Sequence, residues 1–225
     1  TTVDAFLSYC TNDEYQNYLG PRLKISEVDN TDDVFKNDLK QIQNWFDSDS
    51  DLKKLVAVTT SRYKLNNNAH PLSQISSLVN LPGSIYGQWR DGKGVIGVSP
   101  EPLFVKEAKG WRTRSLAGTI STDILNFKRQ LLEDPKERHE HELVISDIVK
   151  KMKPFSKSIK IENTTVENFG KIAHLQTEIF FEAEYLSSEK IVQLLSPTAA
   201  LGGYPQSLSQ KYLQELGYFN KAGEN

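Results

Sequence analysis

The sequence predicts an α+β fold in which antiparallel sheets are flanked by helices. Short runs rich in β-branched and aromatic residues, SIYGQW at 84–89 and GVIGVS at 94–99, are joined by a DGKG turn that is typical of a hairpin. Groups of such strands alternate with segments whose apolar residues have helical spacing, for example 135–152. The sequence contains no internal repeat and no linker, so we expect one domain over residues 1–225.

The first half of the chain is expected to begin its regular structure with an amphipathic helix at 34–46, after the polar run DNTDD. The segment LVAVTTSRY at 55–63 has the β-branched enrichment of a strand that is mostly buried where it begins. A second apolar helix is predicted around 72–79, before the turn signal LPG. The predicted hairpin and a third strand in PLFVKEA at 102–108 follow, and together they indicate antiparallel sheet.

The second half is expected to open with a helix at 124–132. Asp134 and Pro135 then suit the N-cap and first position of a longer helix that runs to about Met152 and ends before Pro154. The remaining predicted elements are strands within 158–169 and 174–185, a short helix at 188–195 capped by a serine pair, and a last amphipathic helix at 206–216 that ends at Gly217.

The composition excludes several classes of function. A net charge of −2, from 27 basic and 29 acidic residues, gives no electrostatic footprint for nucleic acid or for an anionic membrane surface. The single cysteine, Cys10, rules out an internal disulfide framework. No apolar run approaches the roughly 20 residues that span a bilayer, and no charged-then-apolar leader opens the chain. We therefore expect a cytoplasmic protein that acts on a small molecule.

The predicted helix 135–152 carries two acids in line with apolar positions. At 3.6 residues per turn, Glu137 and Glu140 share a stripe with Val144 and Ile148, which should face the core. Two carboxylates three residues apart suit a hard cation such as Mg²⁺, with one binding directly and the other through a water. The alternative is a solvated face on which the acids pair with basic neighbours: Lys136, Arg138 and Lys151.

The two histidines of this helix do not suggest a zinc site. His139 and His141 are two residues apart, so their side chains diverge by about 200° around the helix. A zinc-protease helix would place its histidines at i and i+4.

Separated motifs resemble, in order and character, the chorismate-utilising enzymes, a family that includes isochorismate, salicylate, anthranilate and aminodeoxychorismate synthases. The matching stretches cover roughly residues 50 to 217, and the GGYP ending of the last one is more similar to the isochorismate branch. The matching stretches are GVIGVSPEPLF at 94–104, SLAGT at 115–119, DPKERHEHELV at 134–144, KIAHLQTEI at 171–179 and LSPTAALGGYP at 195–205.

This resemblance implies a partial chorismate-binding catalytic domain with Mg²⁺ as its cofactor. Glu140 would bind the metal directly and Glu137 through a water, while His174 would sit over the ring carboxylate or the leaving-group side. His174 could instead be a hydrogen-bonded core histidine, and the two glycines of GGYP a loop hinge. The resemblance also implies a set of substrate-binding residues: Ala117, Gly118, Thr119, Thr177, Thr198, Gly202 and Gly203.

The resemblance is weaker at the positions of the general base and the general acid of the implied reaction. Two alignments of the family's strand-opening lysine compete, one with Lys54 and one with Ala57 at that position. We favour Lys54 as the base, because a lysine that enters a buried strand can serve as a base near neutral pH; otherwise it is a solvated strand-edge residue. At the position where the isochorismate and salicylate branches have a glutamate, this chain has Arg114, which cannot donate a proton usefully.

The expected function is that of an isomerase converting chorismate to isochorismate in a menaquinone or siderophore branch. The alternatives are salicylate synthase, and an anthranilate or aminodeoxychorismate synthase component, which would need an amidotransferase partner. No arginine follows Arg138, although the family supplies one, with a second metal-binding glutamate, in a further segment of roughly eighty residues. The chain is therefore expected to be a fragment, or a truncated relic of the fold with a binding or interaction role.

Overall fold

The computed structural model describes residues 25–29, 32–57, 62–65, 78, 83–90, 93–99 and 101–217. Contacts between Cα atoms divide the chain into two compact units. The first comprises Thr1–Asp33 and Thr59–Pro102, and the second comprises Val34–Val58 and Leu103–Asn225. The expectation of a single domain over 1–225 stays a prediction, and we describe each unit by itself.

The first unit consists of two antiparallel strand pairs among its described residues. Strand β1 (Ile25–Asp29) pairs with β3 (Arg62–Leu65), and β4 (Ser84–Arg90) pairs with β5 (Lys93–Ser99). The second pair confirms the predicted hairpin. Of the predicted helix 72–79, only Leu78 is described, and it is helical; Cys10 lies outside the described residues.

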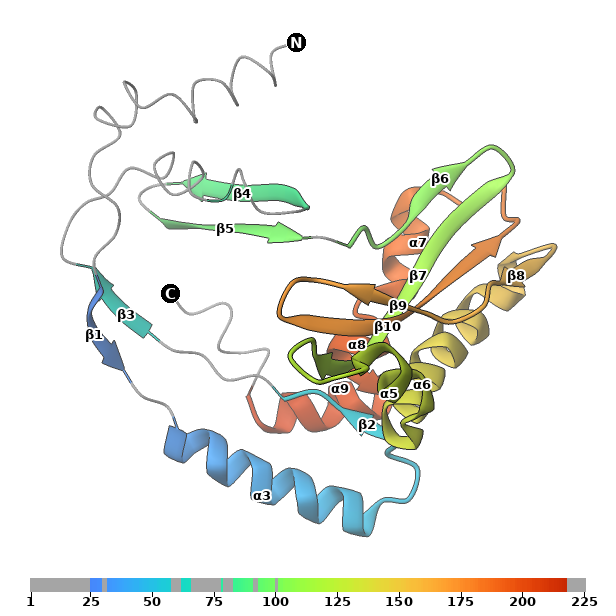
Figure 1. Ribbon diagram of the computed structural model, residues 1–225. Helices are drawn as coiled ribbons and strands as arrows, with labels where there is room; N and C mark the ends of the chain where they lie inside the picture. The colour runs from blue at the N-terminus through green and yellow to red at the C-terminus, as the bar shows by residue number, and fades with distance from the viewer. Residues whose placement is uncertain are drawn as a thin grey trace. The chain divides into compact units, whose positions relative to one another are not determined.

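The second unit is built on an antiparallel sheet of five strands (Figure 1). Its long central pair is β7 (Gly110–Ser121) and β10 (Ile172–Phe181), and β6 (Val105–Glu107) pairs with the free edge of β7. Strands β8 (Ile159–Ile161) and β9 (Thr165–Asn168) pair with opposite ends of β10.

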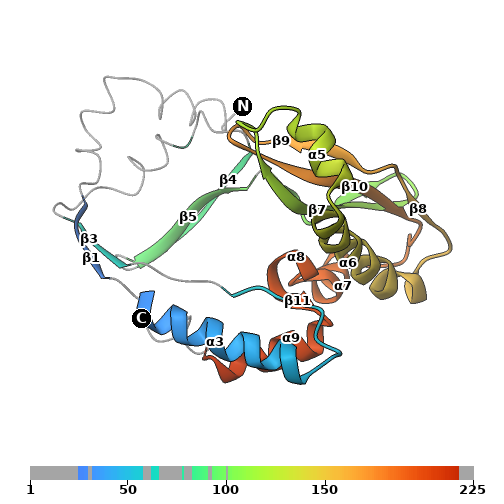
Figure 2. The ribbon, with the colours of Figure 1, turned by 60° about the horizontal axis from the view of Figure 1, so that its bottom comes forward.

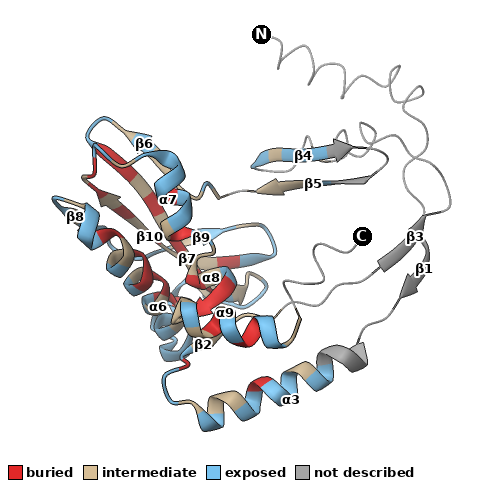
Figure 3. Ribbon diagram, turned by 180° about the vertical axis from the view of Figure 1, so that it is seen from behind, coloured by how far each residue is buried: buried red, intermediate tan, exposed pale blue. Residues whose placement is uncertain are grey.

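Helices pack on one face of this sheet and close the core. Helix α6 (Pro135–Met152) contacts β7 and β10, and α5 (Phe127–Glu133) and α7 (Ser188–Leu195) pack beside it (Figure 2). Buried residues gather along β7, β10 and α6, where odd-numbered residues of β10 alternate with more exposed neighbours (Figure 3). The residues of β10 that face the core are Ala173, Leu175, Thr177, Ile179 and Phe181.

A second group of elements packs around the beginning of α6. Helix α3 (Asp32–Ser48) lies against α9 (Gln206–Glu215), where the rings of Trp45 and Tyr212 stack with centroids 4.4 Å apart. In the same group, β2 (Lys54–Leu55) pairs with β11 (Gly203–Tyr204), which follows the short helix α8 (Ala199–Gly202).

Most predicted elements are confirmed within a few residues, including the Asp134 cap and the helices at 34–46, 188–195 and 206–216. The strand predicted at 55–63 is wrong as one element, because β2 ends at Leu55 and β3 begins at Arg62. The helix predicted at 124–132 begins only at Phe127, after Asn126 adopts a left-handed conformation with φ 56°. None of the helices in the described ranges is long and apolar enough to cross a membrane.

Candidate active site

A cavity of about 480 Å³ lies in the second unit between α3, the segment around β2 and the first turns of α6. Leu39, Ile42 and Phe46 of α3 form its apolar side. On the polar side, Lys54 Nζ donates a hydrogen bond to Glu140 Oε1 at 2.7 Å. The lysine side chain is 12% exposed and the glutamate side chain 33%, so this ion pair is partly shielded from water.

The pairing of β2 with β11 fixes Lys54 at this place. The Lys53 N–H donates to the Tyr204 carbonyl at 2.9 Å, and Leu55 lies opposite Gly203. Gly203 has φ +103°, and a Cβ built on it would lie 2.4 Å from the Lys54 carbonyl oxygen. Only glycine lets the backbone approach this closely. The competing position, Ala57, also borders the cavity, but it carries no group that could transfer a proton.

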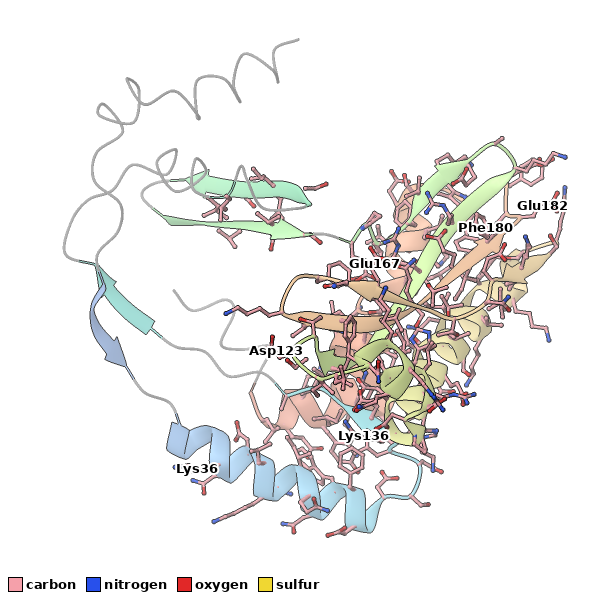
Figure 4. All side chains as sticks on the ribbon, in the orientation of Figure 1. Lys36, Asp123, Lys136, Glu167, Phe180 and Glu182 are labelled. Atoms are coloured by element: carbon pink, nitrogen blue, oxygen red, sulfur yellow. The ribbon has the colours of Figure 1, made fainter. Side chains whose placement is uncertain are left out.

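The second predicted acid, Glu137, lies in the first turn of α6. The Asp134 side chain caps this turn by accepting from the backbone N–H groups of Lys136 and Glu137. Glu137 Oε2 accepts from the Thr119 N–H at 2.8 Å, and Lys136 Nζ donates to Oε1 at 2.6 Å. Lys136, which borders the cavity, is labelled in Figure 4 at the start of α6.

A bulge in the sheet brings Gly118, Thr119 and His174 to this carboxylate. His174 pairs with Thr119 while Leu175 pairs with Ala117, so Gly118 is the extra residue of β7. Gly118 has φ +77°, and a Cβ there would lie 2.9 Å from the Glu137 carbonyl oxygen. His174 Nδ1 lies 2.9 Å from Thr119 Oγ1 and 3.2 Å from the Gly118 carbonyl oxygen.

The structure thus places the predicted residues in two groups, one turn apart on α6, and of these residues only Lys54 and Glu140 line the cavity. Lys54 with Glu140 forms the first group, and Glu137 with Gly118, Thr119 and His174 forms the second. Two further predicted residues lie at the ends of α8. Thr198 is the N-cap residue, and Gly202, the last residue, packs so closely on Pro197 that a Cβ would lie 3.0 Å from Pro197 Cγ.

Thr177 and Ala117 are buried on the face of the sheet that α6 covers. Thr177 lies on the opposite face from His174, since side chains alternate along β10. Its hydroxyl lies 2.8 Å from His141 Nε2 and 2.8 Å from Thr164 Oγ1. The structure therefore does not bring Thr177 together with His174.

His141 is a polar residue of the core that sequence reasoning missed. It is 2% exposed, and its Nδ1 lies 3.4 Å from Ser115 Oγ. Burial lowers the pKa of its imidazole to about 4, against the opposing effects of a backbone hydrogen bond with Ala117 and of the Glu142 and Glu140 charges. The spacing from His141 to Val144 and Ile148, three and seven residues, is the signal that could have placed it on the buried stripe.

On the other face of the sheet, Arg114 pairs with a carboxylate. Its Nη2 lies 3.3 Å from Glu178 Oε1, directly opposite on β10, and Arg112 Nη1 lies 3.1 Å from Glu178 Oε2. A hydrogen bond to Glu107 and the charge of Glu178 raise the pKa of Arg112 above its ordinary value. Glu178 is thus paired with two guanidinium groups.

The chemistry of Glu137 and Glu140 fits a hard divalent cation. Both offer carboxylate oxygens from one face of α6, and their side chains are 14% and 33% exposed; each is paired with a lysine ammonium, which a bound cation would have to displace. The described residues contain no cluster of three or more His, Cys, Asp or Glu that could hold a metal ion. Water or substrate oxygens would have to complete the coordination.

The sequence profile of a family described as chorismate binding enzymes matches residues 5–222. This chain belongs to the chorismate-binding enzyme family. The match spans nearly all of the polypeptide, and it includes every residue of the two groups described above.

Individual relatives agree with the family assignment. The chain is 33% identical over 127 residues to a salicylate biosynthesis isochorismate synthase from Pseudomonas aeruginosa, covering 53% of this chain and 27% of that protein. It is 27% identical over 181 residues to the isochorismate synthase MenF of Haemophilus influenzae, covering 76% of this chain and 42% of that protein. The chain therefore spans less than half the length of either relative.

Solved structures show the same fold. The menaquinone-specific isochorismate synthase MenF from Escherichia coli superposes with a TM-score of 0.78 at 20% identity, covering 87% of this chain and 48% of that one. A DhbC from Bacillus anthracis, described as a putative 2,3-dihydroxybenzoate-specific isochorismate synthase, superposes with a TM-score of 0.76 at 23% identity, covering 88% and 57%. The predicted α+β fold of this family is confirmed.

Proposed function

We propose that this chain is part of a Mg²⁺-dependent enzyme that converts chorismate to isochorismate, in a menaquinone or siderophore branch. The observation that carries the proposal is the contact between Lys54 and Glu140 at the cavity, in a chain of the chorismate-binding family. It places an amine beside a carboxylate suited to a metal, next to a space of the size that small-molecule sites have. The names of the relatives support the isochorismate branch.

The reaction moves a hydroxyl group, since water adds at one ring carbon while the hydroxyl leaves another. It needs a general base for the water, and Lys54, which borders the cavity, would take that role in its neutral form, after losing the proton that it donates to Glu140. A bound Mg²⁺ would neutralise one carboxylate of the dianionic substrate as a Lewis acid. Glu140 would hold the ion directly and Glu137 through a water, with Glu137 oriented by the Thr119 N–H.

His174 would face the substrate from the sheet bulge. Thr119 Oγ1 and the Gly118 carbonyl hold its Nδ1, so the ring is oriented before any ligand arrives. The other ring nitrogen is then available for the substrate carboxylate or for the leaving hydroxyl.

The test is product formation from chorismate with Mg²⁺, using the longest native polypeptide that contains this chain. Glu140→Gln removes one negative charge from the candidate ligand and should reduce turnover by about 100-fold or more. Glu142→Gln removes the same charge from an exposed side chain on the same helix and should leave turnover within about twofold. Equal turnover in both variants would contradict the metal site.

Arg114 favours a second candidate, an anthranilate or aminodeoxychorismate synthase component, because the chain resembles those branches at that position. A component I of anthranilate synthase from Streptomyces coelicolor is 30% identical over 136 residues, covering 56% of this chain. Supplying ammonium with chorismate and Mg²⁺ separates the two. An aminated product would favour the second candidate, and an isochorismate product that is indifferent to ammonium would favour the first.

A further inference from the structure

One side chain of α6 reaches both central strands of the sheet. His141 Nε2 lies 2.8 Å from Thr177 Oγ1 on β10, and Nδ1 lies 3.4 Å from Ser115 Oγ on β7. Ser115 and Thr177 are direct partners in the β7–β10 ladder. The imidazole therefore bridges one rung of the sheet from above, and Thr164 Oγ1 extends the chain of hydrogen bonds beyond Thr177.

Packing alone does not account for a histidine here. Val144 and Ile148 continue the same buried stripe with apolar side chains, which would tolerate small shifts of the helix along the sheet. Hydrogen bonds depend on distance and angle, so a ring that bonds two hydroxyls favours one rotation and one axial position of α6. Replacing the ring with an apolar group would leave both hydroxyls without this partner in the core.

We infer that His141 is a positioning residue that sets the rotation and axial position of α6, and so places the carboxylates of Glu140 and Glu137 for a divalent cation. Glu140 precedes His141 in the chain and Glu137 lies one helical turn earlier, so any rotation of the helix moves both carboxylates. Groups that orient metal ligands from behind often matter almost as much as the ligands themselves. This inference rests on the metal site of the proposed function.

The experiment compares His141→Leu and His141→Gln with Ile148→Val, a core change two turns along the same helix. Leucine fills the space without hydrogen bonds, glutamine can still reach one hydroxyl, and valine should cost stability without touching the bridge. For each protein we would measure the thermal midpoint, the Mn²⁺ dissociation constant by electron paramagnetic resonance, and kcat and KM for chorismate.

We expect His141→Leu to weaken Mn²⁺ binding by about 10-fold to 100-fold, and His141→Gln to recover part of that loss. Ile148→Val should lower the thermal midpoint while leaving the Mn²⁺ dissociation constant unchanged. In an active form of the protein, kcat should fall more than KM rises, since the substrate contacts remain.

Each other outcome has a defined meaning. If the wild type binds Mn²⁺ and both His141 variants bind it equally well, the positioning role is wrong while the metal site stands. If metal affinity follows the thermal midpoint across all variants, including Ile148→Val, His141 is only a core residue. If the wild type itself binds no Mn²⁺, the metal site fails and this inference fails with it. Should His141→Leu not fold, the glutamine variant decides between these outcomes.

Discussion

Lys54 and a bound metal ion would compete for the same carboxylate of Glu140, because the ammonium lies 2.7 Å from Oε1. Lys54→Met removes the competing charge and keeps a side chain of similar length. We expect Mn²⁺ affinity to rise by up to about fivefold, which corresponds to a Coulomb term of about 1 kcal/mol. Turnover of chorismate should fall by about 100-fold or more, since the base is gone. Electron paramagnetic resonance and a product assay measure the two effects.

Lys150→Met is the matched control for this prediction. Lys150 is exposed in the last turn of α6 and does not border the cavity, so its loss changes the net charge by the same amount elsewhere. It should alter neither quantity by more than about twofold. A Lys54 variant that loses turnover and also loses Mn²⁺ affinity would contradict the competition.

Gly118 is the second residue whose role can be tested alone. Gly118→Ala adds a Cβ 2.9 Å from the Glu137 carbonyl oxygen, at φ +77°. The left-handed conformation costs about 1 kcal/mol and the clash adds more, so we expect a loss of about 2 to 4 kcal/mol in the free energy of unfolding. Urea unfolding measures this change.

Gly170→Ala is the control that separates the cost of the steric clash from the cost of the left-handed backbone conformation. Gly170 has φ +87°, but a Cβ there would meet nothing within 4 Å. It should therefore lose only the conformational part, about 1 kcal/mol. Equal losses at both glycines would mean that α6 does not press on the bulge as the structure describes.

At the scale of elements, the ladder between β7 and β10 carries a testable charge pair. Arg114→Glu would place a carboxylate opposite Glu178, and like charges at such positions are unfavourable. We expect a loss of about 1 kcal/mol in unfolding free energy, most of it recovered in the double variant Arg114→Glu with Glu178→Gln. Both values come from urea unfolding.

The same double variant also tests the chemistry of this face. It restores an acid where the isochorismate branch of the family has one, without the repulsion from Glu178. If Arg114 limits the isomerase reaction, turnover of chorismate should rise in the double variant compared with wild type. An unchanged rate would show that the proton comes from elsewhere.

The bridge from α6 to the sheet should make stability depend on pH. The pKa of His141 is lowered from an ordinary value of 6.5 to about 4, so the unfolded chain binds this proton more readily than the folded chain does. The contribution of this lowered pKa to the free energy of unfolding is fully present above pH 6.5 and is lost as the pH falls toward 4. The size of this contribution is on the order of 3 kcal/mol.

Urea unfolding of wild type and His141→Gln between pH 4 and pH 7.5 isolates this contribution. The wild type should lose more stability than the variant across that interval. Parallel curves would mean that His141 titrates normally in the folded protein and is not buried as described.

Local sequence patterns predicted much of the second unit, and the features that they did not predict share a physical cause. The Asp134 cap, Pro135 and the apolar stripe of α6 are determined by neighbours within one or two turns, so the helix was predicted almost to the residue. Strand β2 is only two residues long, and its partner Gly203 is about 150 residues away, so no local pattern could show where the strand ends. Local spacing could have placed His141 on the buried stripe of α6, but it could not show its hydrogen bonds, because the partners Ser115 and Thr177 lie on separate strands.

The features of the candidate site likewise divide into those that the sequence could predict and those that it could not. Motif resemblance picked out Glu137, Glu140, Gly118 and Thr119, and the structure connects three of these through the Thr119 N–H and the bulge. The motif resemblance could not show that Thr177 faces the core, because whether a strand residue is buried depends on which face of the sheet the helices cover. Nor could the resemblance show that Lys54 contacts Glu140, since the position of Lys54 depends on the pairing of β2 with β11.

At the scale of the whole molecule, the positive charge available to a dianionic substrate is limited. Three lysines border the cavity. Lys54 and Lys136 each already pair with a carboxylate of α6, and Lys53 Nζ donates to the Ser50 carbonyl. Arg112 and Arg114 pair with Glu178 on the sheet, and no arginine follows Arg138 in the sequence. The chain spans 48% of the E. coli MenF structure, so the rest of such an enzyme has no counterpart among these residues.

We therefore predict that a polypeptide of these 225 residues alone converts chorismate to isochorismate far more slowly than a longer native form that contains it. Mg²⁺ can neutralise one substrate carboxylate, whereas Arg112 and Arg114 are already paired with Glu178, and the described part of the chain offers the metal no cluster of three ligating side chains. Each lost transition-state contact of this kind costs about 3 kcal/mol, or roughly 100-fold in rate. The comparison is made at equal protein concentration with Mg²⁺, with EDTA as the control for metal dependence. Turnover by the short chain that matches the longer form and is abolished by EDTA would show that the residues described here suffice.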